Sequence, residues 1–211
     1  MSGAAEDLDI RDITDHWPVT SSAVLGDGSL VRLRRDLVQM PGDGDAVARD
    51  ILEHPGAVAV LALDEAGRVL LIRQYRHPVG RKLWEIPAGL RDVAGEPTLV
   101  TAQRELLEEA GYRAADWHVL VDFFPSPGIS TERVRIFCAR GMNEVPESER
   151  SFVPVHEEAH LLVAWVDLDE LVAKVLAGEL HNGVSALGIL SAYAARQGGF
   201  TALRDAEAPE C

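Results

Sequence analysis

Three glutamates crowd the end of one predicted helix, the segment Thr98–Ala110. Glu105, Glu108 and Glu109 follow one another at i, i+3 and i+4, a spacing that stacks their side chains on one side within a single turn. Such carboxylates repel one another by about a few tenths of a kcal/mol per pair, and the helix macrodipole disfavours negative charge at this end. Oxygen ligands of this kind suit Mg²⁺ or Mn²⁺, and the cation would in turn bind a pyrophosphate. For such a triplet on its own, the alternative is a solvated, charged helix face.

The helix that must hold these glutamates has a start signal, an end signal and an apolar face. Pro97 suits the first helical turn, and Gly111 suits the left-handed position that ends a helix. The residues expected to face the core are Leu99, Ala102, Leu106, Leu107 and Ala110. The glutamates are therefore expected on a different side of the helix from the core face.

The rest of the chain predicts strands and helices in irregular alternation. Two apolar, β-branched runs between residues 57 and 75 predict a hairpin inside a sheet. Further strands are expected at residues 117–124, 133–139 and 161–166, and further helices at residues 169–177 and 184–196. This order implies an α/β or α+β core, with a mixed sheet and helices on its faces. Before it, the alternating stretch 21–38 predicts a small N-terminal antiparallel β subdomain.

Composition narrows the classes of function. Of the 211 residues, 47% are hydrophobic, which is enough for one ordinary folded domain with a small appendage. With 34 acidic and 20 basic residues, the formal net charge is −14, which disfavours a nucleic-acid partner because such binding neutralises phosphates with Lys and Arg. No apolar run reaches the roughly 18 residues of a membrane span, and the acidic start does not resemble a secretion signal. Membrane insertion and secretion are therefore disfavoured.

The cysteines and the chain ends add two expectations. Cys138 and Cys211 cannot make a disulfide framework, so a reducing cytoplasm fits best. The two ends, residues 1–15 and 202–211, are expected to be frayed.

The acidic helix is part of a longer pattern that resembles the Nudix hydrolase signature. The matching residues are Gly89, Glu96, Arg104-Glu105-Leu106, Glu108-Glu109 and Gly111-Tyr112. The gap between Gly89 and Glu96 is one residue longer than the family pattern, which changes the loop and leaves the helical positions in place. The resemblance implies a Nudix-type α/β/α sandwich.

In that family the helical glutamates and one loop carbonyl hold divalent ions. The resemblance therefore implies that Glu105 and Glu109 bind metal, that Glu108 binds it directly or through water, and that Ala88 offers its carbonyl. Glu96 and Arg104 would form a supporting pair that fixes the loop against the helix and aligns the ligands.

Two further segments, residues 53–90 and 126–132, resemble the ADP-ribose pyrophosphatase branch of the family. In that branch the N-terminal strands pair with a second subunit, so the resemblance implies a homodimer in which both chains line the substrate pocket. The expected organisation is a dimerisation subdomain at residues 1–54, a Nudix domain at residues 55–198 and a tail at residues 199–211.

The same resemblance implies a set of substrate-binding residues. Arg76 would contact the substrate phosphates, as a planar guanidinium can do with two parallel bonds; the alternative is a basic surface loop. Trp17 could stack on adenine across the dimer, but such a residue more often packs a subunit contact. The remaining positions are Arg49, Leu90, Ser126 and Glu132.

The expected reaction is Mg²⁺-dependent hydrolysis of ADP-ribose to AMP and ribose 5-phosphate, with Mn²⁺ as a possible substitute. In this branch the base comes from the loop before the last strand, where Glu157 and Glu158 lie; one would take the proton and the other would bind metal, and the spacing does not decide which. Two alternatives are the same scaffold acting on another nucleoside diphosphate sugar or dinucleotide, and a non-hydrolytic sensor that binds a nucleotide.

Overall fold

The computed structural model describes residues 9–42, 44–150 and 161–210. Contacts divide the chain into two compact units, Met1–Leu52 and Glu53–Cys211. In the described part of the chain, no helix combines the length and apolar character needed to cross a membrane.

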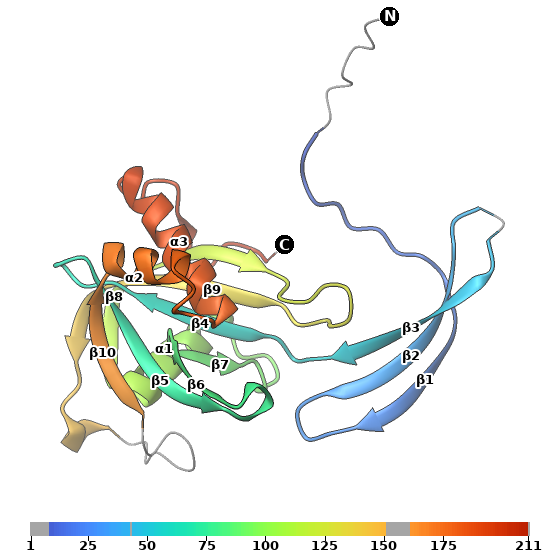
Figure 1. Cartoon of the computed structure of the whole chain (residues 1–211), viewed down its shortest axis with the longest axis horizontal. Helices are drawn as coiled ribbons and strands as arrows, with labels where there is room; N and C mark the ends of the chain where they lie inside the picture. The colour runs from blue at the N-terminus through green and yellow to red at the C-terminus, as the bar shows by residue number, and fades with distance from the viewer. Residues whose placement is uncertain (1–8, 43, 151–160, 211) are drawn as a thin grey trace, which may run out of the picture. The chain divides into compact units, whose positions relative to one another are not determined.

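The first unit is a sheet of three strands in the order β1-β2-β3 (Figure 1). Strands β1 (Val19–Asp27) and β2 (Arg32–Gln39) form the antiparallel hairpin that the sequence predicts, and β3 (Ala46–Glu53) follows. Every residue of β1 is exposed, and the sheet is held partly by ion pairs such as that between Arg35 and Asp50, 2.6 Å apart. This unit therefore has little core of its own.

The second unit contains two sheets. One has the strand order β11-β8-β9-β4-β7, and the other has the order β10-β5-β6. Strands β4 and β9 run parallel, whereas the pairings of β11 with β8, β8 with β9 and β4 with β7 are antiparallel, so the sheet is mixed as predicted. The strands are β4 (Ala57–Ala62), β5 (Arg68–Arg76), β6 (Arg81–Glu85), β7 (Ala88–Leu90), β8 (Tyr112–Phe123), β9 (Val134–Glu144), β10 (Leu162–Asp167) and β11 (Arg204–Asp205). The helices are α1 (Thr98–Ala110), α2 (Leu168–Leu176) and α3 (Gly183–Gln197), with short 3-10 turns at His77–Val79 and Glu147–Glu149.

The hairpin expected between residues 57 and 75 is wrong in its pairing. Both strands form, but β4 belongs to the larger sheet and β5 to the smaller one, and only Leu63 and Val69 bridge them. The reason is that each strand already has partners on both edges: β4 pairs with β7 and β9, and β5 pairs with β6 and β10. A continuous apolar run predicts a buried strand but does not choose its neighbour.

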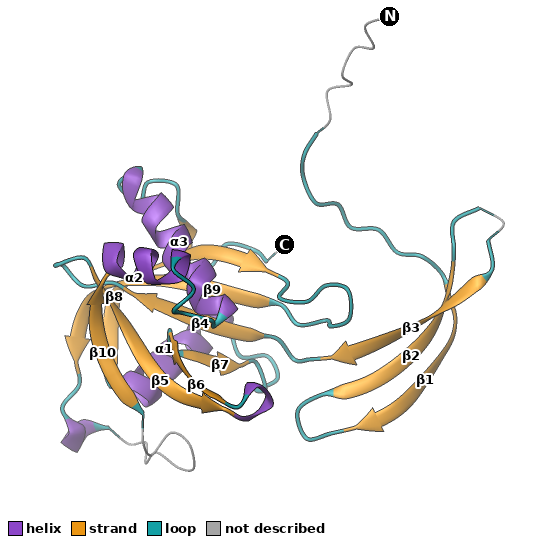
Figure 2. Cartoon of the chain, viewed as in Figure 1, coloured by secondary structure: helices purple, strands orange, loops and turns teal. Residues whose placement is uncertain are grey.

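Helices cover the sheets from two sides (Figure 2). Alternate residues of β4 belong to different apolar clusters: Val58 and Val60 pack in the cluster that contains Ala102 and Leu106 of α1. Ala59 and Leu61 pack in the other cluster, with residues of α2 and α3. Because successive side chains of a strand point to opposite faces, α1 lies on one side of the sheet and α2 and α3 lie on the other. The predicted α/β/α sandwich is confirmed.

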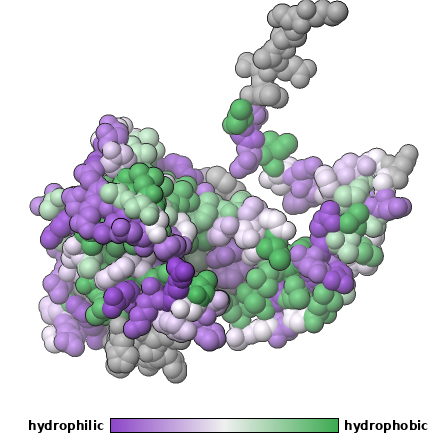
Figure 3. Space-filling view, viewed as in Figure 1, coloured by the Kyte–Doolittle hydropathy of each residue, from purple (hydrophilic) through white to green (hydrophobic). Residues whose placement is uncertain are grey.

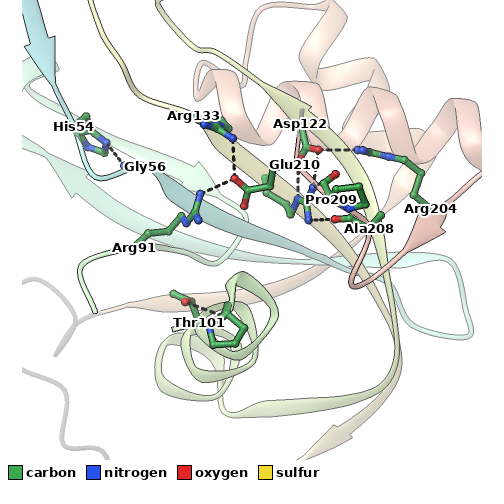
Figure 4. A network of polar contacts seen from close by, with 12 residues as sticks. His54, Gly56, Arg91, Thr101, Asp122, Arg133, Arg204, Ala208, Pro209 and Glu210 are labelled. Carbon is green, nitrogen blue, oxygen red and sulfur yellow. Dashed lines mark hydrogen bonds and ion pairs between the residues drawn. The ribbon is translucent and has the colours of Figure 1, made fainter. Parts of the chain in front are cut away.

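The C-terminal segment is packed, so the expectation of a frayed end is wrong for residues 204–210. Strand β11 pairs with β8, and the buried guanidinium of Arg135 donates hydrogen bonds to the carbonyls of Ala208 (2.7 Å) and Pro209 (3.1 Å) (Figure 4). Arg91 and Arg133 both donate to Oε2 of Glu210, at 2.9 and 3.0 Å. Arginines from distant parts of the sequence thus bind this segment. No pattern within the segment itself predicts these contacts.

Candidate active site

The acidic helix α1 begins and ends where the sequence predicts. It spans Thr98–Ala110, with Pro97 as its N-cap and Gly111 as a left-handed C-cap at φ 75°. The N–H of Gly111 bonds the carbonyls of Leu106 and Leu107, which closes the last turn. Buried residues of α1 include Ala102, Leu106 and Ala110, so the three glutamates lie off the core face and are half-buried.

Glu109 joins the end of α1 to strand β7. Its Oε2 accepts a hydrogen bond from the backbone N–H of Ala88 at 2.8 Å. Strand β7 pairs with β4 in the antiparallel direction. The carbonyl of Pro87 accepts a hydrogen bond from the N–H of Val60, and the N–H of Arg91 donates to the carbonyl of Gly56, so these backbone groups face β4. In such a pair, the backbone groups of successive residues point alternately toward the partner strand and away from it. Ala88 follows Pro87, so its N–H and its carbonyl both point away from β4 and toward the glutamates.

Glu105 lies against the backbone of Gly89, the next residue of β7. A Cβ built on Gly89 would be only 2.0 Å from Cδ of Glu105, so any side chain larger than hydrogen would occupy the place of this carboxylate. Glycine is needed here for space and not for its backbone angle, because Gly89 has no positive φ. Glu105 and Glu109 therefore meet two successive residues of the same short strand.

Arg104 connects the remaining carboxylates. Its Nη1 donates to Oε1 of Glu105 at 2.7 Å and to Oε2 of Glu108 at 3.2 Å, and its Nη2 lies 3.4 Å from Oε2 of Glu96. Partial burial lowers the pKa of Arg104, but the charges of Glu105 and Glu108 and the hydrogen bonds outweigh it, so the pKa stays above its ordinary value. The guanidinium is therefore charged and holds Glu105 and Glu108 close together.

The donors at this junction suit a hard cation. Carboxylate oxygens and a backbone carbonyl are the ligands that Mg²⁺ and Mn²⁺ prefer, and the space kept by Gly89 lets Glu105 approach β7. Among the described residues, no three Asp, Glu, His or Cys side chains are already arranged as a metal-binding group. The hydrogen bonds of the three glutamates explain this: Glu105 and Glu108 bond Arg104, whereas Glu109 bonds the backbone of β7.

Comparison with known proteins decides the family. The family model of the NUDIX domain matches residues 53–186, which is more than half of the chain. The chain belongs to the Nudix family. Its fold resembles a crystal structure described as an ADP compounds hydrolase, with a TM-score of 0.71 at 17% identity, covering 90% of this chain and 98% of that one.

Two curated Nudix relatives carry the same name. The ADP-ribose pyrophosphatase of Mycobacterium tuberculosis is 47% identical over 178 residues, which cover 84% of each chain. The ADP-ribose pyrophosphatase of Bacillus subtilis is 35% identical over 162 residues, which cover 77% of this chain and 84% of that protein. The prediction that this chain is an enzyme of the Nudix family is confirmed.

Arg76, which the sequence places at the substrate phosphates, is held by a glutamate that the sequence reasoning missed. Its Nη2 bonds Oε2 of Glu85 at 2.7 Å, and its Nε lies 3.0 and 3.2 Å from the two oxygens of the same carboxylate. The Glu85 side chain is 3% exposed, whereas that of Arg76 is 43% exposed. The sequence does contain a signal for Glu85, which is a single acidic residue inside the apolar run Leu83–Ile86. A charge in a buried strand needs a partner, so this residue predicts an ion pair.

Ser185 is a second residue that the sequence reasoning missed. It is 1% exposed, and its hydroxyl accepts from the N–H of Ile86 at 2.9 Å and donates to Oδ1 of Asn182 at 3.0 Å. Ile86 lies between Glu85 and the Ala88 that bonds Glu109. The start of α3 thus anchors the segment that connects the Arg76 pair to the acidic helix. No local signal points to a contact across 99 residues.

The loop at residues 126–132 is a tight turn in the Nudix domain. The carbonyl of Ser126 accepts from the N–H groups of Ile129 (3.1 Å) and Ser130 (2.9 Å), and the hydroxyl of Ser130 accepts from the N–H of Glu132 at 3.0 Å. Ser126 is exposed and Glu132 is half-buried. Leu90, also assigned to the substrate, is half-buried at the end of β7, beside Gly89.

Of the other predicted site residues, two belong to the first unit and two are outside the described residues. Trp17 and Arg49 belong to the first unit; Trp17 is 46% exposed and its Nε1 bonds Asp15 at 3.0 Å, whereas Arg49 is exposed and bonds the carbonyl of its neighbour Ala48. Glu157 and Glu158 lie outside the described residues.

Proposed function

We propose that this protein hydrolyses the pyrophosphate bond of ADP-ribose, giving AMP and ribose 5-phosphate, and that it requires Mg²⁺, with Mn²⁺ as a substitute. The observation that carries the proposal is the junction of α1 and β7, where Glu105 and Glu109 meet Gly89 and Ala88. The relatives named ADP-ribose pyrophosphatase, at 47% and 35% identity, support this substrate.

Glu105, Glu108, Glu109 and the carbonyl of Ala88 would hold the metal. When bound, divalent cations neutralise a diphosphate, position a water and lower the pKa of that water. Glu109 would also help to position the Ala88 carbonyl, because its hydrogen bond from the N–H of Ala88 fixes the strand that presents this carbonyl. Arg104 keeps Glu105 and Glu108 together and offsets their mutual repulsion.

Arg76 would steady the diphosphate. A guanidinium oriented by a buried carboxylate loses little further freedom when it binds an anion, and Glu85 supplies that orientation. Leu90, Ser126 and Glu132 would line the remainder of the site.

The proton from the attacking water needs an acceptor. We assign this role to Glu157 or Glu158, which precede β10 in the sequence; the other residue would bind metal. This assignment rests on the position of both residues in the family pattern.

We also propose that the enzyme is a homodimer in the cytoplasm, with Trp17 and Arg49 of one copy reaching the substrate site of the other. Support comes from the sheet of the first unit. Its strands expose apolar side chains, and the unit has little core of its own (Figure 3). The exposed apolar residues include Val19, Val24, Leu25, Leu33, Leu37 and Val47. Exposed apolar side chains on a sheet with so little core are typical of a subunit contact.

The test is turnover of ADP-ribose by the purified enzyme, with and without Mg²⁺, compared between wild type and Glu109→Gln. Glutamine keeps an oxygen that can accept the N–H of Ala88 and removes only the charge, so the fold contact is retained. We expect AMP release that depends on Mg²⁺ and falls by about 10²-fold or more in Glu109→Gln.

Glu65→Gln is the matched control, because Glu65 is exposed in the turn between β4 and β5. It should turn over ADP-ribose at the wild-type rate. Equal rates for wild type and Glu109→Gln would refute the metal assignment. Binding of ADP-ribose without any hydrolysis would instead favour the nucleotide sensor.

A further inference from the structure

The side chain of Thr101 is buried on the polar side of α1. It is 1% exposed, although threonine hydroxyls are usually at the surface. Its Oγ1 lies 2.7 Å from Oε2 of Glu96 and 3.4 Å from the carbonyl of Pro97. Because a carboxylate only accepts and the hydroxyl has a single proton, the short contact is a bond donated by Thr101 to Glu96.

The oxygen that Thr101 binds is the same oxygen that faces Arg104. Oε2 of Glu96 lies 3.4 Å from Nη2 of Arg104, whose other terminal nitrogen bonds Glu105 and Glu108 at 2.7 and 3.2 Å. A continuous series of polar contacts therefore runs from Thr101 through Glu96 and Arg104 to two of the proposed metal ligands.

Without the hydroxyl of Thr101, the short, well-aligned contact of Glu96 is lost. The remaining contact with Arg104 is long for a charge-assisted bond, which normally measures about 2.7–2.9 Å. The Glu96 side chain is 18% exposed, so water compensates only in part for a missing donor. Glu96 would then rotate, and Arg104 would be held only by the carboxylates that it should position.

We propose that Thr101 is a positioning residue for the metal site: its hydroxyl fixes Glu96, which orients Arg104 and thereby Glu105 and Glu108. The inference rests on the proposed function, since it assumes that these glutamates bind metal. Partners of this kind that orient ligands typically change metal affinity or activity by about 10–100-fold when they are removed.

The experiment measures metal binding separately from turnover. Mn²⁺ affinity is determined by electron paramagnetic resonance without substrate, and kcat and KM for ADP-ribose are then measured at saturating Mn²⁺. Thr101→Val and Thr101→Ala both remove the hydroxyl, the first with nearly unchanged shape and the second with a better helix former. Thr101→Ser keeps the hydroxyl and serves as the rescue.

We expect both variants without the hydroxyl to bind Mn²⁺ about 10-fold more weakly and to lose kcat, while KM for ADP-ribose changes by less than about 2-fold. Thr101→Ser should bind Mn²⁺ within about 3-fold of wild type. Thr201→Val removes an exposed hydroxyl that bonds the carbonyl of Gly198 at 2.9 Å, and it should leave Mn²⁺ affinity unchanged.

Wild-type Mn²⁺ affinity in Thr101→Ala would overturn the inference, and so would a failure of Thr101→Ser to restore it. The same titration separates this failure from that of the proposed function. If Glu109→Gln binds Mn²⁺ as tightly as wild type does, the helix is not the metal site and both proposals are refuted. If Glu109→Gln loses the metal while Thr101→Ala keeps it, only the role of Thr101 is refuted.

Discussion

Gly89 and Glu105 are in direct contact across the junction of β7 and α1. A Cβ on Gly89 would lie 2.0 Å from Cδ and 2.1 Å from Oε1 of Glu105, distances at which the carboxylate must move. The Glu105 side chain is 13% exposed and also bonds Arg104 at 2.7 Å, so it has little freedom to turn elsewhere. The glycine of β7 thus determines where a proposed metal ligand lies.

Gly89→Ala is expected to weaken metal binding and activity together. The added methyl group displaces Glu105 from β7, which should lower Mn²⁺ affinity and kcat by about 10–100-fold. Overpacking should also cost about 1–3 kcal/mol of unfolding free energy. Titration with Mn²⁺, steady-state kinetics and urea denaturation measure the three effects.

Gly183→Ala provides the control for this substitution. Gly183 is the first residue of α3, its φ is not positive, and nothing lies within 4 Å of a built Cβ. Its replacement should leave metal affinity and kcat unchanged. An equal response of both glycines to alanine would mean that Gly89 acts through general stability and not through Glu105.

Ser185→Ala is expected to destabilise the segment that links Glu85 to Ala88. The substitution leaves the buried N–H of Ile86 without its acceptor, which should cost about 1–3 kcal/mol of unfolding free energy. The cap of α3 survives, because Oδ1 of Asn182 also accepts from the backbone N–H of Ser185 at 2.8 Å. Urea denaturation gives the stability, and the kcat for ADP-ribose should fall as the anchored segment loosens.

Asn182→Ala separates the cap from the anchor. It removes the helix cap at a cost of about 0.5–2 kcal/mol and leaves the hydroxyl of Ser185 facing Ile86. We expect lower stability with nearly unchanged kcat. A loss of kcat as large as that of Ser185→Ala would show that the anchor acts only through the cap of α3.

The bounds of the acidic helix could be predicted because its signals are local, although Thr101 is buried where the pattern predicted Leu99 and Leu107. The capping residues Pro97 and Gly111, the apolar spacing and the glutamate triplet all lie within one short segment, and α1 has the predicted bounds. Most of the longer strands were also predicted as elements, whereas β3, β6, β7 and β11 were not. The placement of the strands in two sheets was not predicted, because the partners of β4 and β5 come from distant parts of the chain.

The parts of the site that escaped prediction depend on contacts between distant residues or on burial. The hydroxyl of Ser185 reaches Ile86 across 99 residues, and an isolated serine in a helix has no pattern that reveals this. The bond from Thr101 to Glu96 lies within five residues, but it depends on burial, which a threonine alone does not predict. The packed C-terminal segment has the same origin, because Arg135 lies 73 residues before the carbonyl that it binds.

A buried ion pair between β8 and β9, which also contacts Arg204 of that segment, makes stability depend on pH. Asp122 and Arg135 are 6% and 3% exposed at their side chains and lie 2.7 Å apart, and Arg204 adds a contact at 3.0 Å. Burial raises the pKa of Asp122, but the hydrogen bonds and charges of the two arginines outweigh it, so the pKa lies below its ordinary value. Stability from this carboxylate is therefore present above the unfolded-state pKa of about 3.9 and is lost as the pH falls through the lower folded-state pKa.

Asp122→Asn should expose this dependence. At pH 7 the variant leaves Arg135 buried beside a neutral amide, and breaking such a pair costs about 3–5 kcal/mol. As the pH falls below about 4 and through the lower folded-state pKa, the wild-type carboxyl takes up a proton as well, so the difference in unfolding free energy between the two proteins should shrink toward zero. Urea denaturation at a series of pH values measures it, with the exposed Asp92→Asn as control. A difference that stays constant over the whole pH series would mean that the ionisation of Asp122 does not contribute to stability.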